Sequence, residues 1–313
     1  YSFSRFRYIH SQISEDPMFA VQNSELVPKT ACFFSKDLDV YIDMSDGVNK
    51  DLNIKEYCGR MIKCISISQG KKFLFFKASY SPKWSSNLET LADQNNGKVI
   101  PFFKWSFNDN FYSHLLPNIQ TLRKKCRSAT KNIDLGFFAD PDKVYDYPTP
   151  SGTEPLVSCM DINKFGLREI LGSEVGPVSV VDNNSRQLVI DKLRSTGLSL
   201  YTGGLSYANY IEKSQECKAL FNPPGIGEYT SRIMDQCALG NIIILRKNSY
   251  DQGHSWKNYI PEVELQDEDF KSKIVSIIEN QEEWRQKSIE YYENFWKPEK
   301  VFLFLKNQIE SNL

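Results

Sequence analysis

A glycine-containing turn followed by Thr, Ser and Arg combines residue types that can hold a phosphate group. Gly225 and Gly227 let the backbone turn tightly and approach a ligand. Thr230 and Ser231 offer hydroxyl donors, and Arg232 offers a fork of donors that suits a diphosphate. A helix that begins here adds free backbone N–H groups and a positive dipole end. The same spacing also fits an ordinary turn with a surface arginine, and no Walker-type Gly-Lys-Ser/Thr follows.

Acidic residues follow two apolar runs that are expected to be strands. Asp46 comes after 39–44, where a carboxylate can act as a general base, although it also suits a simple turn. Asp140 and Asp142 come after 133–139 and form an Asp-x-Asp pair of the kind that holds a divalent ion. The proline between them favours a turn. We therefore expect no metal site.

Cysteine and histidine usage argues against a zinc site or a disulfide framework. The seven cysteines are scattered without a Cys-x-x-Cys pair, and the three histidines are far apart. Reduced, buried thiols are the favoured interpretation, which points to a cytoplasmic compartment. A secretory lumen stays open as an alternative if an upstream signal has been removed, because residue 1 is Tyr.

The elements that must position these residues alternate between apolar strands and amphipathic helices from about residue 177 onward. The pattern predicts strands at 177–181, 198–202, 219–222 and 242–245, and helices at 185–195, 207–215 and 230–239. Gly197 and Gly240 are expected to end two of these helices. Such alternation is typical of a doubly wound parallel sheet.

The first part of the chain is less regular but similar in kind. The pattern predicts strands at 39–44, 99–104 and 133–139, a hairpin of 60–68 with 71–78, and helices at 88–94, 119–126 and from 267 to the end. We therefore expect an N-terminal domain at 1–155, a C-terminal domain at 156–280, and a final helix at 281–313 that packs back on the first domain. Both domains are expected to be Rossmann-like.

Three segments together share a pattern with one enzyme family. Residues 218–232 read as a strand, a glycine turn and a Ser-Arg helix start, 240–247 as a short apolar strand with a Lys, and 256–261 as Trp...Tyr-Ile-Pro. These segments resemble the donor half of the GT-B glycosyltransferases, and are most similar to the protein O-glucosyltransferase and capsule-associated (CAP10-like) family. Residues 39–46 and 100–106 resemble the family's acceptor half, with Ser45 in place of the family's Arg.

The resemblance implies two Rossmann-like domains that face each other across a cleft, with an acceptor in the first and a UDP-sugar in the second. It implies inversion with Asp46 as the base, no metal cofactor, glucose or xylose as the transferred sugar, and a glycan or protein hydroxyl as acceptor. The donor contacts that it implies are Tyr201, Thr202, Gly203, Phe138, Asp140, Gly225, Ile226, Gly227, Glu228, Tyr229, Thr230, Ser231 and Arg232.

Composition excludes several other classes of protein. The 313 residues carry a formal net charge of -1, which lacks the basic excess of a dedicated nucleic-acid binder. No apolar run approaches the ~20 residues of a membrane-spanning helix. A Rossmann oxidoreductase is disfavoured because no G-x-G-x-x-G follows a first strand.

Two alternatives to the GT-B enzyme stay open. The missing Arg before Asp46 motivates a GT-B-like module that binds a nucleotide or glycan without turnover. Asp140 and Asp142 motivate a metal-dependent transferase of the GT-A type.

Overall fold

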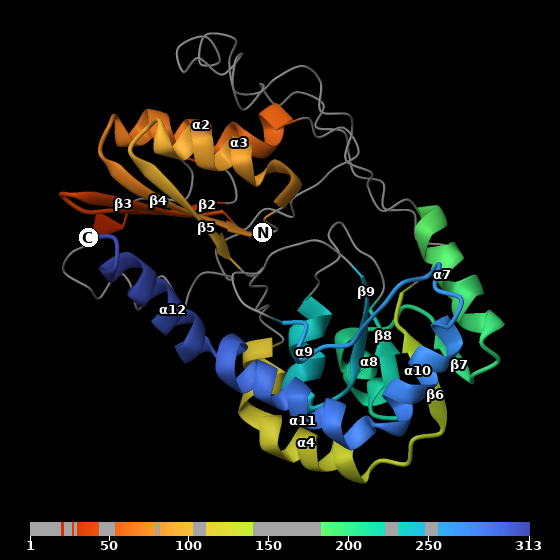
Figure 1. The fold of residues 1–313 in the computed structure, drawn as a ribbon. Coiled ribbons are helices and arrows are strands. Elements are labelled where there is room, and N and C mark those ends of the chain that lie inside the picture. Colours follow the sequence, from red (N-terminus) through yellow and green to blue (C-terminus); the bar gives the residue numbers. More distant parts are fainter. Residues whose placement is uncertain are drawn as a thin grey trace.

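The chain folds into two Rossmann-like α/β units, each built around one five-stranded sheet (Figure 1). This computed structural model describes residues 20–21, 27, 30–43, 54–78, 80, 82–102, 111–139, 183–222, 231–247 and 256–313. The predicted fold class, two α/β units in one chain, is confirmed. Several of the segments expected to line a cleft between the units, 44–53, 140–155 and 223–230, lie outside the described residues, so the cleft stays an expectation.

The first sheet contains three parallel strands with two antiparallel strands at one edge. Its order is β1-β2-β3-β4-β5, with strands at Ala20–Val21, Thr30–Phe34, Leu38–Asp43, Lys72–Ala78 and Gly97–Phe102. Helices α2 (Ile54–Ser68) and α3 (Pro82–Asp93) connect the parallel strands. Both helices lie on the same face of the sheet in Figure 1.

The predicted hairpin of 60–68 with 71–78 is wrong, because the first of these segments is the end of helix α2. Met61, Ile62 and Ile65 recur at helical spacing and are buried, while Lys63 between them is exposed. Gly70, with a φ of 85°, then turns the chain into β4. The strand β4 pairs in parallel with β3, so the two segments cannot form a hairpin.

The second sheet is parallel throughout and has the order β10-β9-β8-β6-β7. Its strands are β6 (Ile133–Phe137), β7 (Leu200–Thr202), β8 (Cys217–Phe221), β9 (Ile243–Arg246) and β10 (Glu262–Val263). Helices α7 (Asn183–Ser195), α8 (Tyr207–Ser214) and α9 (Ser231–Leu239) alternate with the strands. The predicted elements from 185 to 245 are therefore confirmed to within two residues at each end, whereas the strand expected at 177–181 lies outside the described residues.

Strand β6 belongs to the second sheet, although the expected boundary near residue 155 puts it in the first domain. It lies between β7 and β8, and its last three residues, 135–137, are buried. A Cβ added at Gly136 would lie 2.7 Å from the Phe138 ring and 2.8 Å from Cys217 Sγ. Helix α4 (Ile119–Ser128), which precedes β6, packs against α9 of the second unit as well. A border drawn by the sheets therefore falls between β5 and α4.

The C-terminal segment contacts both units. It consists of α10 (Phe270–Glu279), α11 (Gln281–Tyr291), the short π-helix η4 (Tyr292–Trp296) and α12 (Pro298–Glu310), so the helical end expected after 267 is confirmed. Helix α11 packs on α9, whereas α12 runs toward the first sheet (Figure 1). There the Phe304 ring stacks on Phe102 with centroids 6.2 Å apart, and Lys98 Nζ donates to Asn312 Oδ1 at 3.2 Å.

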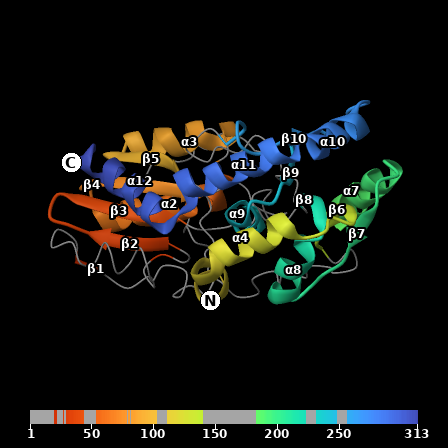
Figure 2. The ribbon, with the colours of Figure 1, turned by 90° about the horizontal axis from the view of Figure 1, so that it is seen from below.

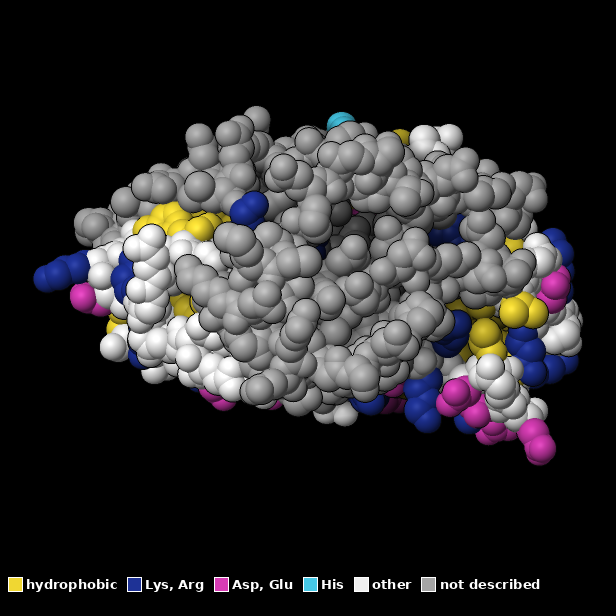
Figure 3. All heavy atoms as spheres, turned by 90° about the horizontal axis from the view of Figure 1, so that it is seen from above, with side chains coloured by type: hydrophobic (Ala, Val, Ile, Leu, Met, Phe, Trp, Pro, Cys, Tyr) yellow, Lys and Arg dark blue, Asp and Glu magenta, His cyan; other side chains and the backbone are white. Residues whose placement is uncertain are grey.

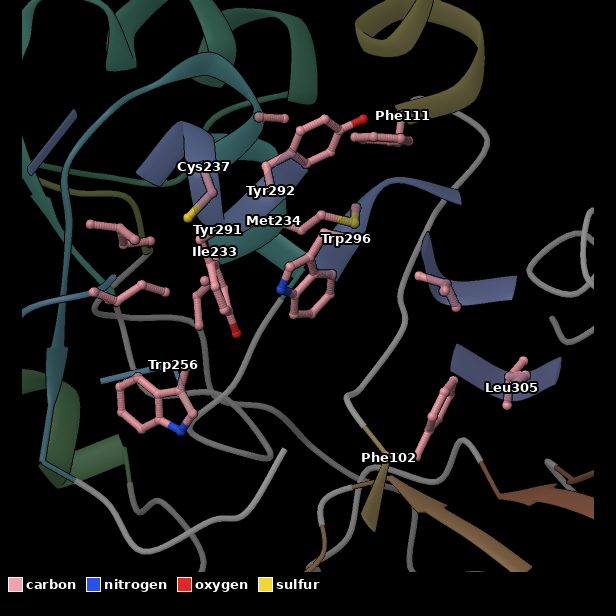
Figure 4. Packing of buried hydrophobic residues seen from close by; sticks show 14 of the residues in the cluster. Phe102, Phe111, Ile233, Met234, Cys237, Trp256, Tyr291, Tyr292, Trp296 and Leu305 are labelled. Carbon is pink, nitrogen blue, oxygen red and sulfur yellow. The ribbon is translucent and has the colours of Figure 1, made fainter. Parts of the chain in front are cut away.

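One buried cluster joins residues from both units and from the C-terminal helices. Figure 4 shows Met234 of α9 beside Trp296, with Phe102 of the first sheet facing Leu305 of α12. Each of these four side chains is at most 1% exposed. The apolar side chains of the last two helical segments therefore contribute to the core that the two units share.

The surface carries charges of both signs. In the view from above, Lys and Arg side chains stand close to Asp and Glu side chains at the edge of the molecule (Figure 3). Within the described ranges, no helix has the length and apolar character needed to cross a bilayer.

Candidate functional site

The carboxyl ends of the parallel strands in the second sheet form one edge where several predicted residues meet. Phe138 follows β6, Gly203 follows β7, Asn222 follows β8 and Lys247 follows β9. In open parallel sheets, ligands bind outside this edge. Helix α9 starts here, so Arg232 stands in its first turn at the same edge. The structure thus brings Arg232, Gly203 and Phe138 to one side of the sheet.

Arg232 is free to bind an anion at this edge. Its side chain is partly exposed, and it has no ion-pair partner among the residues that the structure describes. Its positive charge acts on the carboxyl of Asp235, about one turn further along α9. The first backbone N–H groups of α9 also point toward this edge, because the first turn of a helix leaves them without intrahelical partners.

Aromatic rings pack beneath this edge. The centroid of the Phe138 ring lies 5.2 Å from that of Tyr201 and 5.2 Å from that of Tyr210. Phe138 is 5% exposed, so this predicted donor contact is mainly a core residue that supports the edge. Tyr201, Thr202 and Gly203 are partly exposed and stay available for contact with a ligand. The backbone N–H of Gly203 donates to the carbonyl of Phe137 at 3.4 Å, which holds the two strand ends together.

Asp235 is a buried acid that local sequence patterns do not reveal. It is 2% exposed, and burial raises the pKa of its carboxyl to about 7, although the Tyr207 hydroxyl and Arg232 partly offset this rise. Tyr210 of α8 and Tyr292 of η4 also interact with its charge, and burial raises the pKa of both phenols. Asp235 therefore lies behind the edge, where it affects Arg232 through charge.

The raised pKa of Asp235 predicts that stability falls as pH rises. The ordinary pKa of the carboxyl is 3.8, so the folded protein holds this proton more tightly than the unfolded chain does. Stability should decrease between about pH 4 and 7, by up to about 1.4 kcal/mol per pH unit. The phenols of Tyr207, Tyr210 and Tyr292, whose pKa values are raised by burial, stay protonated over this range.

Urea unfolding of the wild type and Asp235→Asn across this pH range measures the effect. The unfolding free energy of the wild type, relative to that of Asp235→Asn, should decrease with each step in pH. The decrease should level off above pH 7. A difference that stays constant with pH would show that Asp235 titrates as it does in the unfolded chain.

A fully buried ion pair lies at the corresponding edge of the first sheet. Asp43, the last residue of β3, is 0% exposed, and its Oδ2 atom lies 2.8 Å from Nζ of Lys77 on β4, which is 1% exposed. Arg60 Nε lies 3.9 Å from the other carboxylate oxygen. The sequence signal for this pair is a lysine that directly follows the apolar run 73–76 and continues the same strand. The proposed base Asp46 is three positions further along the chain.

Many of the predicted site residues lie outside the described residues. They are Asp46, Asp140, Asp142, Gly225, Ile226, Gly227, Glu228, Tyr229 and Thr230. Ser231 opens α9. In the part of the chain that the structure describes, no three His, Cys, Asp or Glu side chains are grouped so that they could hold a metal ion. Asp140 and Asp142, the predicted Asp-x-Asp pair, lie outside the described residues.

Comparison with known proteins gives one likeness of fold. No known family model matches the sequence, and no curated protein matches it significantly. Among solved structures, the chain is similar to that of Anabaena Alr3699/HepE in complex with UDP, with a TM-score of 0.41 and 11% sequence identity. The likeness covers 80% of this chain and 76% of the other.

Proposed function

We propose that the protein is a GT-B glycosyltransferase that moves xylose or glucose from a UDP-sugar to a hydroxyl of a glycan or protein. The observation that carries the proposal is the position of Arg232, which is unpaired among the described residues, in the first turn of α9. This turn directly follows the glycine segment 225–227 and stands at the carboxyl edge of a parallel sheet. The resemblance of 218–232 and 256–261 to the CAP10-like family supports the same assignment.

The proposed reaction is a direct displacement at the anomeric carbon. Asp46 takes the proton of the acceptor hydroxyl, whose oxygen forms a bond to the anomeric carbon while the bond from that carbon to the diphosphate oxygen breaks. UDP leaves with the bonding electrons, and the configuration is inverted. Arg232 and the first N–H groups of α9 stabilise the negative charge that develops on the diphosphate. No metal cofactor is proposed.

Loss of the Arg232 guanidinium is expected to weaken UDP binding by about 10- to 100-fold. A hydrogen bond to a charged group contributes about 1.5–3 kcal/mol, and 1.4 kcal/mol corresponds to a tenfold change in affinity. Calorimetric titration of UDP into wild type and Arg232→Ala, each in EDTA, measures this change. GDP serves as the ligand control. Because Arg232 is partly exposed, the melting temperature without ligand should change little.

Arg194→Ala is the matched control for this experiment. Arg194 is an exposed arginine on α7 that pairs loosely with Asp191, at 3.8 Å. Its removal should leave UDP affinity within twofold of wild type. The donor-site proposal fails if wild type does not bind UDP, or if both variants bind it equally well.

Turnover assays with UDP-glucose and UDP-xylose separate the enzyme from its two alternatives. Asp46→Asn should retain UDP binding and lose transfer of the sugar. UDP binding without any turnover in the wild type would favour a non-catalytic GT-B-like module. Turnover that EDTA abolishes would favour a metal-dependent enzyme that uses Asp140 and Asp142.

A further inference from the structure

A pocket lies at the end of α9 opposite to Arg232. It has a volume of about 230 Å³ and is lined by α4, by α11, by Leu239 at the end of α9 and by Gly240, which follows that helix. Figures 1 and 2 both show α4 and α11 running side by side here. Since α9 has nine residues with a rise of about 1.5 Å each, one helix length separates this cavity from the candidate donor site.

The lining of this cavity is strongly cationic. Arg123, Lys124 and Arg127 come from α4 and Arg285 comes from α11, whereas Glu282 is the one acid in the lining. Basic side chains this close together repel one another unless an anion lies between them.

Lys131, just beyond the end of α4, is a further basic group beside this cavity. Burial lowers the pKa of this amine, and the positive charge of Arg285 lowers it further. Lys131 Nζ lies 3.6 Å from Sγ of Cys126, which is a lining residue. The positive charge around the cavity therefore extends beyond its own lining.

One of the four basic side chains, Arg123, is bonded on several sides by other residues of the protein. Arg123 Nε donates to the carbonyl of Ala238 at 2.7 Å, its Nη2 pairs with Glu293 at 2.8 Å, and its guanidinium lies 5.6 Å from the Tyr292 ring centroid. It is therefore a structural part of the wall.

The three other cations keep N–H donors that a ligand can use. They are Arg285, Lys124 and Arg127. Arg285 Nη1 contacts Glu282 at 3.2 Å, while its buried Nε has no hydrogen-bond partner among the described residues. Lys124 and Arg127 are exposed and have no ion pair within the described ranges. With Arg123 neutralised by Glu293 and Arg285 by Glu282, two positive charges remain in excess. A phosphate ester carries about -1.5 to -2 charges at neutral pH, which matches them.

We propose that this cavity is a second anion site that binds a phosphate ester group. Arg285 and Arg127 supply planar donor forks of the kind that recognise phosphate at two oxygens, and Lys124 adds a point charge. The volume is below the roughly 300–1,000 Å³ of pockets for drug-sized ligands, so it suits a phosphate group rather than a whole nucleotide-sugar. The phosphate belongs either to a small soluble molecule or to a lipid headgroup.

Phosphate titration of the Arg232→Ala protein tests the proposal, because that background weakens anion binding at the candidate donor site. Inorganic phosphate is the probe, and binding is followed by calorimetry at constant ionic strength. Arg127→Ala in this background should reduce phosphate affinity at least tenfold, and Arg285→Gln should do the same. Arg127 is exposed, so its replacement should not impair folding even if that of Arg285 does.

Lys125→Ala is the matched control. Lys125 is an exposed cation on the same helix, but it does not line the cavity. Its loss should change phosphate affinity by less than twofold. Equal losses in Lys125→Ala and Arg127→Ala would overturn the proposal, because they would reflect general surface charge. An absence of saturable phosphate binding would overturn it as well.

Vesicles distinguish the two sources of the phosphate. Flotation with phosphatidylcholine vesicles that contain phosphatidic acid should capture the protein if a lipid headgroup is the ligand, and Arg127→Ala should abolish the capture. Saturable binding of inorganic phosphate without capture by vesicles would assign the site to a soluble phosphate ester. The site is independent of the donor site, so UDP affinity should be unchanged in Arg127→Ala whether or not the proposed glycosyltransferase activity is correct.

Discussion

Replacing Asp43 with alanine is expected to lower the free energy of unfolding by about 3–5 kcal/mol. The carboxylate lies 2.8 Å from Nζ of Lys77, and the two side chains are 0% and 1% exposed. Removal of the acid leaves the lysine charge buried next to an apolar strand, where it cannot regain its hydration. The cost is therefore that of a buried charge that has lost its carboxylate counter-ion, which is larger than the value of an exposed ion pair.

Equilibrium urea unfolding, followed by circular dichroism, gives the free energy for a set of variants. The double variant Asp43→Ala/Lys77→Met should recover most of the loss, because buried ion pairs are often replaced by apolar side chains at little cost. Glu310→Ala is the control, since Glu310 pairs with Lys306 on the exposed face of α12 and should cost at most about 0.5 kcal/mol. If Asp43→Ala costs no more than Glu310→Ala, the buried pair contributes nothing to stability.

Truncation of Phe102 to alanine is expected to lower the free energy of unfolding by about 3–5 kcal/mol. The change removes the Phe102 ring from the contact between the first sheet and helix α12. Phe102 is 0% exposed, and its ring centroid lies 5.8 Å from that of Phe76 and 6.2 Å from that of Phe304. The partner rings come from a neighbouring strand and from the C-terminal helix. The cavity left by the mutation can close only if these elements move together.

A double-mutant cycle with Phe304→Ala separates the ring contact from the loss of buried area. The coupling energy between the two rings should be about 0.5–1.5 kcal/mol, the value typical of aromatic pairs. Leu303→Ala is the control on the same helix, because Leu303 is 47% exposed and its truncation should change stability little. Additive losses in the Phe102/Phe304 cycle would mean that the rings touch without stabilising each other.

The second sheet could be predicted well from the sequence because its elements carry local stop signals. Gly197 and Gly240 adopt φ values of 73° and 75° at the ends of α7 and α9, and an apolar strand follows each. Arg232 could be placed at the sheet edge from the sequence as well, because it lies in the first turn of a helix whose start was predicted correctly. Local chemistry was therefore sufficient to predict these elements and this residue.

The errors arise where structure depends on partners that are distant in sequence. The segment 60–68 is rich in Ile and was predicted as a strand, but it is the end of α2 and packs its apolar side chains against those of the first sheet. Strand β6 pairs with strands more than 60 residues away in the chain, which no local pattern reveals. The burial of Asp235 likewise depends on α8 and η4, so the shift in its pKa could not be foreseen.

The contact of α12 with the first sheet has a consequence for how the chain is made. The ribosome completes β4 and β5 long before it synthesises Phe304, whose ring packs against Phe76 and Phe102. At about 5–20 residues per second, the delay is on the order of 10–40 s. During that time the nascent chain presents an uncovered aromatic surface, which is the kind of surface that chaperones recognise. Translation that stops before α12 would leave this surface exposed permanently, and thereby mark the incomplete product for degradation.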